Sequence, residues 1–161
     1  MSSAFLTIDG DVETPLALSF EELSAIRGTF QVSDVSQIDP KRKGDAVRLT
    51  GLLEMARPKP TARYLTLHSS SDDFHASIPL DAVRERAILI YRLEGEPLPF
   101  SAGGPVRFFI PDFAACHTAE IDACANVKFV DRIELSSDRG IDNRPHDEQQ
   151  HAQLHEREAK Q

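Results

Sequence analysis

The side chains best able to bind a metal or act as nucleophiles lie together in one stretch of the chain, DFAACHTAEIDACANVK. It contains both cysteines, Cys116 and Cys124, and His117 beside the first of them. Two cysteines eight residues apart match no standard zinc spacing, and a tetrahedral site needs two more ligands, for which His68 or His75 would have to serve. Three interpretations stay open: a metal site, a reversible disulfide, and thiols that only pack in the loop. A neighbouring Cys–His pair without a third orienting residue does not indicate a hydrolase.

A second group of candidate residues lies around GEPLPFSAGGPVRFFIP. Gly103 and Gly104 permit a positive φ or a close approach of the backbone to a ligand, and a tight turn requires the same freedom. Arg107 lies in the otherwise apolar run VRFFI, where a charged residue must face a polar surface or pair with an opposite charge. The same argument applies to Lys128 in NVKFV. These residues are candidates for ligand binding.

The segment SSSDD places hydroxyls and carboxylates at the end of an expected strand. Ser69, Ser70, Asp72 and Asp73 could hydrogen-bond a ligand, or they could form a turn and cap the next element. No general acid or base can be assigned from their spacing.

Charge is uneven along the 161 residues. The formal net charge is −8, which disfavours nucleic acid and anionic membranes as partners. Residues 39–63 are nevertheless basic, with seven Lys and Arg against three Asp and Glu. This stretch is either a solvated basic surface or a receptor for an anionic ligand.

The composition predicts a single domain in a reducing compartment. Forty per cent of the residues are apolar, enough for one sizeable core. MSSAFLTIDG lacks the basic and apolar regions of a signal peptide, and no run approaches the roughly 20 apolar residues of a membrane span. We therefore expect a cytoplasmic protein with reduced cysteines.

Short strands alternate with brief helices along the chain, which predicts a mixed α+β domain. Ser19 and Glu22 form a capping-box pattern at the start of a helix that Gly28 ends. A second helix near LTGLLEMA must finish before Pro58, and DAVRER predicts one or two helical turns. The expected strands are AFLTIDG, TFQVSDV, AVRL, RYLTLH, FHASIPL, AILIYRL, VRFFIP and VKFVDRIEL. Pro79 keeps FHASIPL from being a central strand.

The chain changes character after Ser136. Residues 137–161 hold almost no large apolar side chain, so we expect a domain over 1–136 and a polar tail over 137–161, flexible or a frayed helix. His151 and His155 would share one face of such a helix and could, with His146, bind a transition metal.

Four segments in this order resemble the molybdopterin-binding domain of the sulfite oxidase family, over roughly residues 4–136. RLEGEPLPFSAGGPVRFFIP is similar to the signature "dGepLp..hGgPlRlvvP", and NVKFVDRIEL to the closing "vKwv.rIe". LTIDGDVETPLALSFEEL resembles the family's opening strand and helix, and VRLTGLLEMARPKPTARYLTLHSSSDDFHASIPLDAV its middle. The resemblance implies an α+β fold of mixed sheets with short helices. It also implies molybdopterin or the molybdenum cofactor as ligand.

The resemblance also implies roles for particular residues. The family arginine that corresponds to Arg107 lies near the pterin, and Lys128, Gly103, Gly104 and the loop Ser69, Ser70, Asp72, Asp73 are assigned to the same ligand. Family members with molybdenum bind it through a cysteine thiolate in a "CV.GW" run, which falls here on QVSDVS. Gln31 then stands where the thiolate would be, with Ser33 near it and Val35 at the aromatic position. A glutamine amide is a poor substitute for a thiolate.

Two functions from different classes follow. One is an oxidoreductase of the sulfite oxidase type with a degenerate or nonstandard metal site, in which the cofactor carries the two-electron chemistry. The other is a binding or interaction module that keeps the fold, binds no cofactor and has no redox chemistry. The dimerisation and haem domains of sulfite oxidases proper do not fit in this chain, so an electron acceptor would be a separate redox protein. The substrate, the electron partner and the oligomeric state are not indicated.

Overall fold

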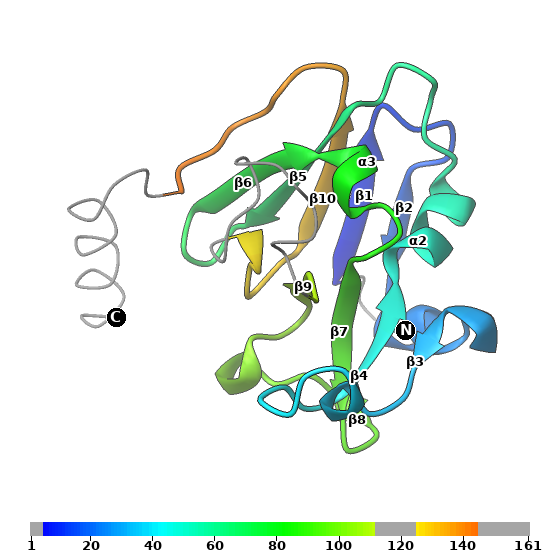
Figure 1. The fold of residues 1–161 in the computed structure, drawn as a ribbon, viewed down its shortest axis with the longest axis vertical. Coiled ribbons are helices and arrows are strands. Elements are labelled where there is room, and N and C mark those ends of the chain that lie inside the picture. The colour runs from blue at the N-terminus through cyan, green and yellow to red at the C-terminus, as the bar shows by residue number, and fades with distance from the viewer. Residues whose placement is uncertain (1–4, 112–124, 145–161) are drawn as a thin grey trace.

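The computed structural model describes residues 5–111 and 125–144, which form two five-stranded sheets with short helices between them (Figure 1). The first sheet has the order β2-β1-β10-β5-β6 and the second β3-β4-β7-β8, with β9 also paired to β7. Among the described strands, β1 and β10 form the one parallel pair. The strands of the first sheet are β1 (Leu6–Gly10), β2 (Leu16–Leu18), β5 (Tyr64–Ser69), β6 (Phe74–Pro79) and β10 (Arg132–Ser136). Those of the second are β3 (Gln31–Val32), β4 (Asp45–Arg48), β7 (Ile88–Leu93), β8 (Glu96–Pro97) and β9 (Arg107–Phe109).

The helices are short. They are α1 (Phe20–Ser24), α2 (Leu49–Ala56) and α3 (Leu80–Val83), with single 3-10 turns at η1 (Gly28–Phe30), η2 (Val35–Gln37) and η3 (Phe100–Ala102). The first begins and the second begins and ends where the sequence predicts, but the first already ends at Ser24, and Gly28 instead begins a 3-10 turn. The capping box of Ser19 and Glu22 is present at the start of α1. Helix α2 ends at Ala56, and the next residue, Arg57, has a left-handed φ of 54° just before Pro58. Among the described residues, no helix is long and apolar enough to cross a bilayer.

The two sheets share one main core. Alternate residues of the first sheet, such as Ile8, Leu65 and Ile133, pack in the same cluster as Val47 and Leu89 of the second. A smaller cluster covers the other face of the second sheet, and we call this its outer face. Its members are Val32, Val35, Ala46, Ile88, Ile90, Leu98 and Phe109. The mixed α+β fold with short helices is confirmed.

Two strand predictions are wrong in extent. TFQVSDV contains only the two-residue strand β3, between η1 and η2. Asp34 adopts a left-handed φ of 61° and caps η2 by accepting a hydrogen bond from the Ser36 N–H, so the backbone turns where a strand was predicted. In VKFVDRIEL the strand begins only at Arg132, because Phe129 has a φ of 60°. FHASIPL lies at the edge of its sheet, as the proline predicted.

The described start of the expected tail lies along β6. The Asn143 N–H donates to the His75 carbonyl, and the Asn143 side-chain oxygen accepts from the His75 N–H. The Ser77 N–H donates in turn to the Asp142 carboxylate. Residues 140–144 therefore satisfy backbone groups of an edge strand that would otherwise be open to another chain. The remainder of the expected tail lies outside the described residues, as do the histidines His146, His151 and His155.

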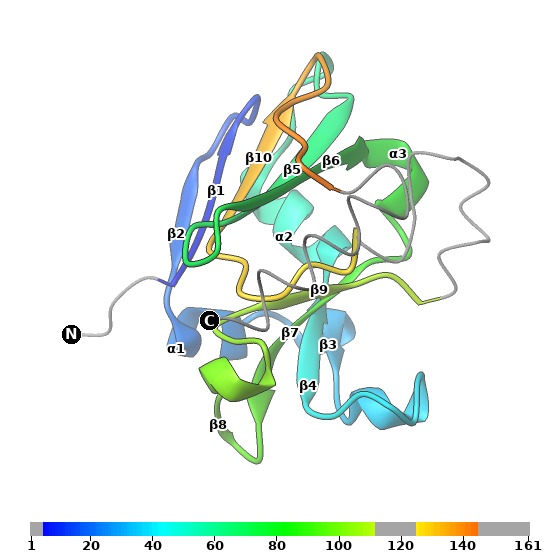
Figure 2. The ribbon, with the colours of Figure 1, turned by 90° about the vertical axis from the view of Figure 1, so that its left-hand side faces the viewer.

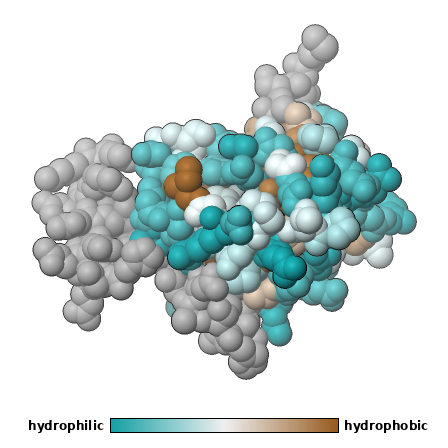
Figure 3. Space-filling view, turned by 90° about the horizontal axis from the view of Figure 1, so that it is seen from above, coloured by the Kyte–Doolittle hydropathy of each residue, from teal (hydrophilic) through white to brown (hydrophobic). Residues whose placement is uncertain are grey.

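Most of the surface seen from above is hydrophilic, and hydrophobic residues appear there only as small separate spots (Figure 3). Exposed large apolar side chains among the described residues are Ile38, Met55, Phe100 and Ile141. Isolated exposed apolar residues of this kind are ordinary on protein surfaces.

Candidate anion-binding site

Arg107 lies on the outer face of the second sheet without a carboxylate partner among the described residues. It is paired in register with Ile90 of β7, and Phe109, two residues on, points to the same face. The Arg107 side chain is half-buried, and its Nε has almost no contact with solvent and no hydrogen-bond acceptor. Burial lowers the pKa of Arg107 from its usual value, and the positive charge of Arg42 lowers this pKa further. The fold therefore holds this cation at a cost that an anionic ligand would offset.

Arg42 reaches the same face from the loop between η2 and β4. Its guanidinium lies over the Phe109 ring, 4.7 Å from the ring centroid. Its Nε is 3.8 Å from the Asp39 carboxylate, too far for a hydrogen bond, and has no other partner. The sequence predicted a basic surface in this stretch, but it did not distinguish Arg42 from its basic neighbours as a candidate ligand-binding residue. The excess of Lys and Arg over residues 39–63 was the available signal.

Gly103 brings Arg107 and Lys128 together. Its φ is 103°, and a Cβ at this position would lie 3.2 Å from the Arg107 Cδ and 3.4 Å from the Lys128 Cγ. The Phe129 N–H donates to the Gly103 carbonyl, and residues 125–131 run beside β9 (Figure 2). Gly103 therefore makes a turn and leaves room for these two cationic side chains, and its role in ligand binding stays a prediction.

Gly104 has a packing role. A Cβ there would lie 1.8 Å from the Leu98 carbonyl oxygen, so no other residue fits without moving the backbone. The tight path of residues 98–104 places the exposed Phe100 ring on Phe129, with centroids 4.3 Å apart. Phe129 of this stack directly follows Lys128 in the chain.

The polar groups of the loop 69–73 are hydrogen-bonded to other groups of the protein. Ser69 donates its hydroxyl to the Asp72 carboxylate, and the Ser70 N–H donates to the Asp131 carboxylate. Asp73 has a left-handed φ of 51° and its carboxylate accepts a hydrogen bond from a ring nitrogen of His75, 2.8 Å away. These contacts fit the turn and capping interpretation, and the bond to Asp131 joins the loop to the segment that carries Lys128. A role in ligand binding stays a prediction.

Gln31 is held by three hydrogen bonds at the opposite face of the second sheet. Its Nε2 donates to the carbonyls of Leu23 and Ile26, at 2.9 and 3.2 Å, in the turn that follows α1. Its Oε1 accepts from the hydroxyl of the fully buried Tyr91, at 2.8 Å. Gln31 pairs in register with Val47 of the main core, whereas its neighbour Val32 lies in the outer cluster with Phe109. Gln31 and Arg107 therefore point to opposite faces.

The placement of the "CV.GW" run agrees with the backbone at one position. That run has a glycine three residues after the thiolate, and the residue here is Asp34, with its left-handed φ of 61°. Ser33 is exposed and Val35 is fully buried in the outer cluster.

The described residues fit the pterin end of a molybdenum cofactor and include no ligand suited to its metal. Arg107, Lys128 and Gly103 form a cationic cradle suited to the phosphate and polar edges of a pterin. The amide of Gln31 is hydrogen-bonded through both its nitrogen and its oxygen and faces away from Arg107, so it does not take the place of a metal-binding thiolate. The candidate metal ligands Cys116, His117 and Cys124 lie outside the described residues. In the part of the chain that the structure describes, no group of three or more His, Cys, Asp or Glu could hold a metal ion.

His68 and His75, the other suggested zinc ligands, are bonded to each other and to carboxylates. Their Nδ1 atoms are 2.8 Å apart, and the Nε2 of His68 lies 2.9 Å from the Glu134 carboxylate. Two nitrogens bound to one tetrahedral zinc ion at about 2.0–2.1 Å lie about 3.3 Å apart, which is farther than the 2.8 Å between these two atoms. In this arrangement the pair is a hydrogen-bonded bridge between β5, β6 and β10.

Comparison with known proteins decides the family. Residues 43–142 match the model of the oxidoreductase molybdopterin binding domain. The chain belongs to this family. Its fold is also similar to the crystal structure of the sulfane dehydrogenase SoxCD from Paracoccus pantotrophus, with a TM-score of 0.60 and 22% identity over 83% of this chain and 38% of that one. At this identity the likeness supports the fold.

One curated relative is a Bacillus subtilis (strain 168) protein named uncharacterized oxidoreductase YuiH. It is 32% identical over 113 residues, which span 66% of this chain and 56% of the relative. The chain therefore matches about half the length of that relative. The family match begins at residue 43, so it includes Arg107 and Lys128 but not Gln31. The resemblance to a molybdopterin-binding, oxidoreductase-like domain is confirmed.

Proposed function

We propose that this domain binds the phosphorylated pterin of molybdopterin through Arg107, Lys128 and the backbone at Gly103. The observation that supports it most is the unpartnered Arg107 guanidinium. It has no carboxylate among the described residues, and its pKa is lowered by burial and by a second arginine. A phosphate or an acidic pterin edge would supply the missing negative charge.

Within this proposal each residue has a distinct task. Arg107 is half-buried and presents a planar set of donors, so it orients the ligand as well as attracting it. Lys128 is exposed and contributes a screened point charge. The loop of Ser69, Ser70, Asp72 and Asp73 borders the site through Asp131. If the full cofactor is bound, molybdenum supplies two-electron redox chemistry, and electrons leave to a separate redox protein. A cytoplasmic location also stays a prediction.

The test is the pterin content of the full chain purified from a host that makes molybdopterin. We expect bound pterin in the wild type and a loss of about tenfold or more in affinity for Arg107→Gln, since a charged hydrogen bond contributes about 1.5–3 kcal/mol. Lys128→Gln should lose less, because exposed charges contribute about 1 kcal/mol or less. Arg86→Gln, an exposed arginine after α3, is the matched control and should keep the wild-type content.

Two results would contradict the proposal. One is folded wild-type protein without pterin, which would favour the interaction module that binds no cofactor. The other is equal pterin content in Arg107→Gln and Arg86→Gln.

A further inference from the structure

The geometry points to a phosphate-binding site on the outer face of the second sheet, with Arg42 and Arg107 as its two cations. Its ligand is an organic phosphate monoester that carries no molybdenum. The inference deepens the proposed function and rests on it only for the identity of the organic part. The inference makes two claims. Arg42 belongs to the phosphate site, and Gln31 does not bind a metal.

Arg42 and Arg107 form a pair of like charges held close by the fold. Both Nε atoms are buried from solvent, and neither has a hydrogen-bond acceptor. Folding would not bring two such groups together for stability alone, because their repulsion and desolvation both cost free energy. A phosphate dianion placed between them offsets both costs, and each guanidinium can donate two bonds to its oxygens.

The loop before β4 holds Arg42 in position before any ligand arrives. The Val35 N–H donates to the Gly44 carbonyl and closes the loop, and the Arg42 N–H donates to the Asp39 carbonyl. The Asp39 carboxylate accepts from the Lys41 N–H at 3.0 Å. Its contact with the Arg42 Nε is long, at 3.8 Å, so it orients this side chain without satisfying it. The buried Phe109 ring supports the guanidinium from below. A preorganised cation of this kind loses little entropy on binding.

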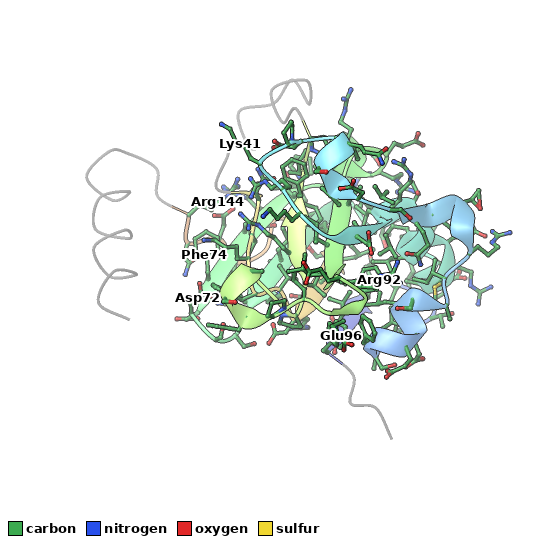
Figure 4. All side chains as sticks on the ribbon, turned by 90° about the horizontal axis from the view of Figure 1, so that it is seen from below. Lys41, Asp72, Phe74, Arg92, Glu96 and Arg144 are labelled. Carbon is green, nitrogen blue, oxygen red and sulfur yellow. The ribbon has the colours of Figure 1, made fainter. Side chains whose placement is uncertain are left out.

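The neighbouring basic residues differ from Arg42 in burial. Lys41 and Lys43 are exposed, and Figure 4 marks Lys41 on this loop. They add to the general positive charge, whereas only Arg42 of the three contacts Phe109 and lowers the Arg107 pKa. This difference makes the two lysines matched controls for charge.

The metal-free part of the inference rests on Gln31. Its amide nitrogen donates to carbonyls in the turn that follows α1, and its oxygen accepts from Tyr91. It also faces the main core, on the other side of the second sheet from Arg107. A residue tied in this way supports packing and supplies no ligand in place of the thiolate.

The first experiment titrates inorganic phosphate into the full chain and follows the thermal midpoint, with sodium chloride matching the ionic strength throughout. We expect a saturable rise in the wild type, Lys41→Gln and Lys43→Gln. In Arg42→Gln and Arg107→Gln the apparent Kd should rise about tenfold or more. Equal responses in all five proteins, or no response in the wild type, would overturn the phosphate receptor.

The second experiment measures molybdenum and pterin together in protein from a host that makes the cofactor. Pterin without equimolar molybdenum supports the metal-free site, and equimolar molybdenum in the wild type overturns it while leaving the proposed function intact. A phosphate response that depends on Arg42, in protein that carries no pterin, would instead refute the proposed function and leave the receptor standing. The two failures are therefore distinguishable.

Discussion

One buried arginine on the outer face of the first sheet and one on the outer face of the second differ in whether they have a carboxylate partner. On the first sheet Arg144 is only 4% exposed, and its guanidinium bonds the Asp142 carboxylate through Nε at 3.0 Å and through a terminal nitrogen at 2.6 Å. On the second sheet Arg107 has no acceptor for its Nε and faces another arginine. Arg144 therefore has a carboxylate partner, whereas Arg107 has none among the described residues. The difference separates a cation that holds the fold together from one available to a ligand.

The first sheet extends this compensation across its strands. His75 bonds Asp73, His68 bonds Glu134, and the Arg132 Nε donates to the Asp9 carboxylate at 3.0 Å. The bond to Asp9 raises the pKa of Arg132, with the nearby carboxylates adding to this effect against burial. Polar side chains on this face thus join β1, β10, β5 and β6. The second sheet also pairs Arg92 with Asp45, at 2.9 Å, whereas its Arg107 has no carboxylate partner among the described residues.

Removing Arg144 should have the largest effect on stability. Arg144→Ala leaves the Asp142 carboxylate, only 5% exposed, without its main partner, and we expect a loss of about 3–5 kcal/mol in the free energy of unfolding. Urea denaturation measures it. Arg139→Ala is the control, because Arg139 bonds the same carboxylate from a side chain that is 46% exposed, and it should cost about 1 kcal/mol or less. Equal losses in the two variants would break the distinction between the faces.

Gln31 should come next, as a test of whether its role is structural. Gln31→Leu leaves the Tyr91 hydroxyl and the Ile26 carbonyl without the partner they have in the wild type, and we expect a loss of about 1–3 kcal/mol in the free energy of unfolding. Gln31→Cys should lose a similar amount and gain no molybdenum, since this side chain faces away from Arg107. The exposed Gln37→Leu is the control for loss of an amide. A Gln31→Cys protein that is stable and loaded with molybdenum would refute this assignment.

Acid sensitivity should follow from Asp142. Burial tends to raise its pKa, but hydrogen bonds from Arg144 and from the Ser77 N–H outweigh it, so the folded-state pKa lies below the unfolded one. The resulting stabilisation is present above the unfolded value of about 3.9 and is lost as pH falls through the folded pKa. The free energy of unfolding of Asp142→Asn, measured from pH 5 downward, should therefore decline less steeply than that of the wild type. Parallel curves for the two proteins would contradict this linkage.

The secondary structure could be predicted from the sequence where interactions between residues close in the chain determine it. The pattern of Ser19 and Glu22 predicted a capping box because both groups lie within one helical turn, and Pro79 predicted an edge strand because it lacks a donor. The strand predicted around Gln31 was too long, because the turn at Asp34 depends on a left-handed conformation that polar alternation does not reveal.

Only some residues of the candidate site could be predicted from the sequence. Arg107 and Lys128 were found because a charge in an apolar run is conspicuous, and Gly103 because glycine marks a turn. Arg42 was lost among the neighbouring basic residues, since only the fold shows which of them lies on Phe109. The bond between Gln31 and Tyr91 joins residues 60 positions apart, and no local pattern indicates it.

Replacing Arg107 should change stability least, and it tests the comparison most directly. Without ligand, Arg107→Gln removes a desolvated charge and its repulsion with Arg42, so the free energy of unfolding should stay within about 0.5 kcal/mol of the wild type or rise. Arg144→Gln, the same change on the other face, should be strongly destabilising, and urea denaturation of both variants measures the contrast. A marked loss of stability in Arg107→Gln would mean that the arginine is already compensated within the protein. Its openness to a ligand, on which the anion site depends, would then be wrong.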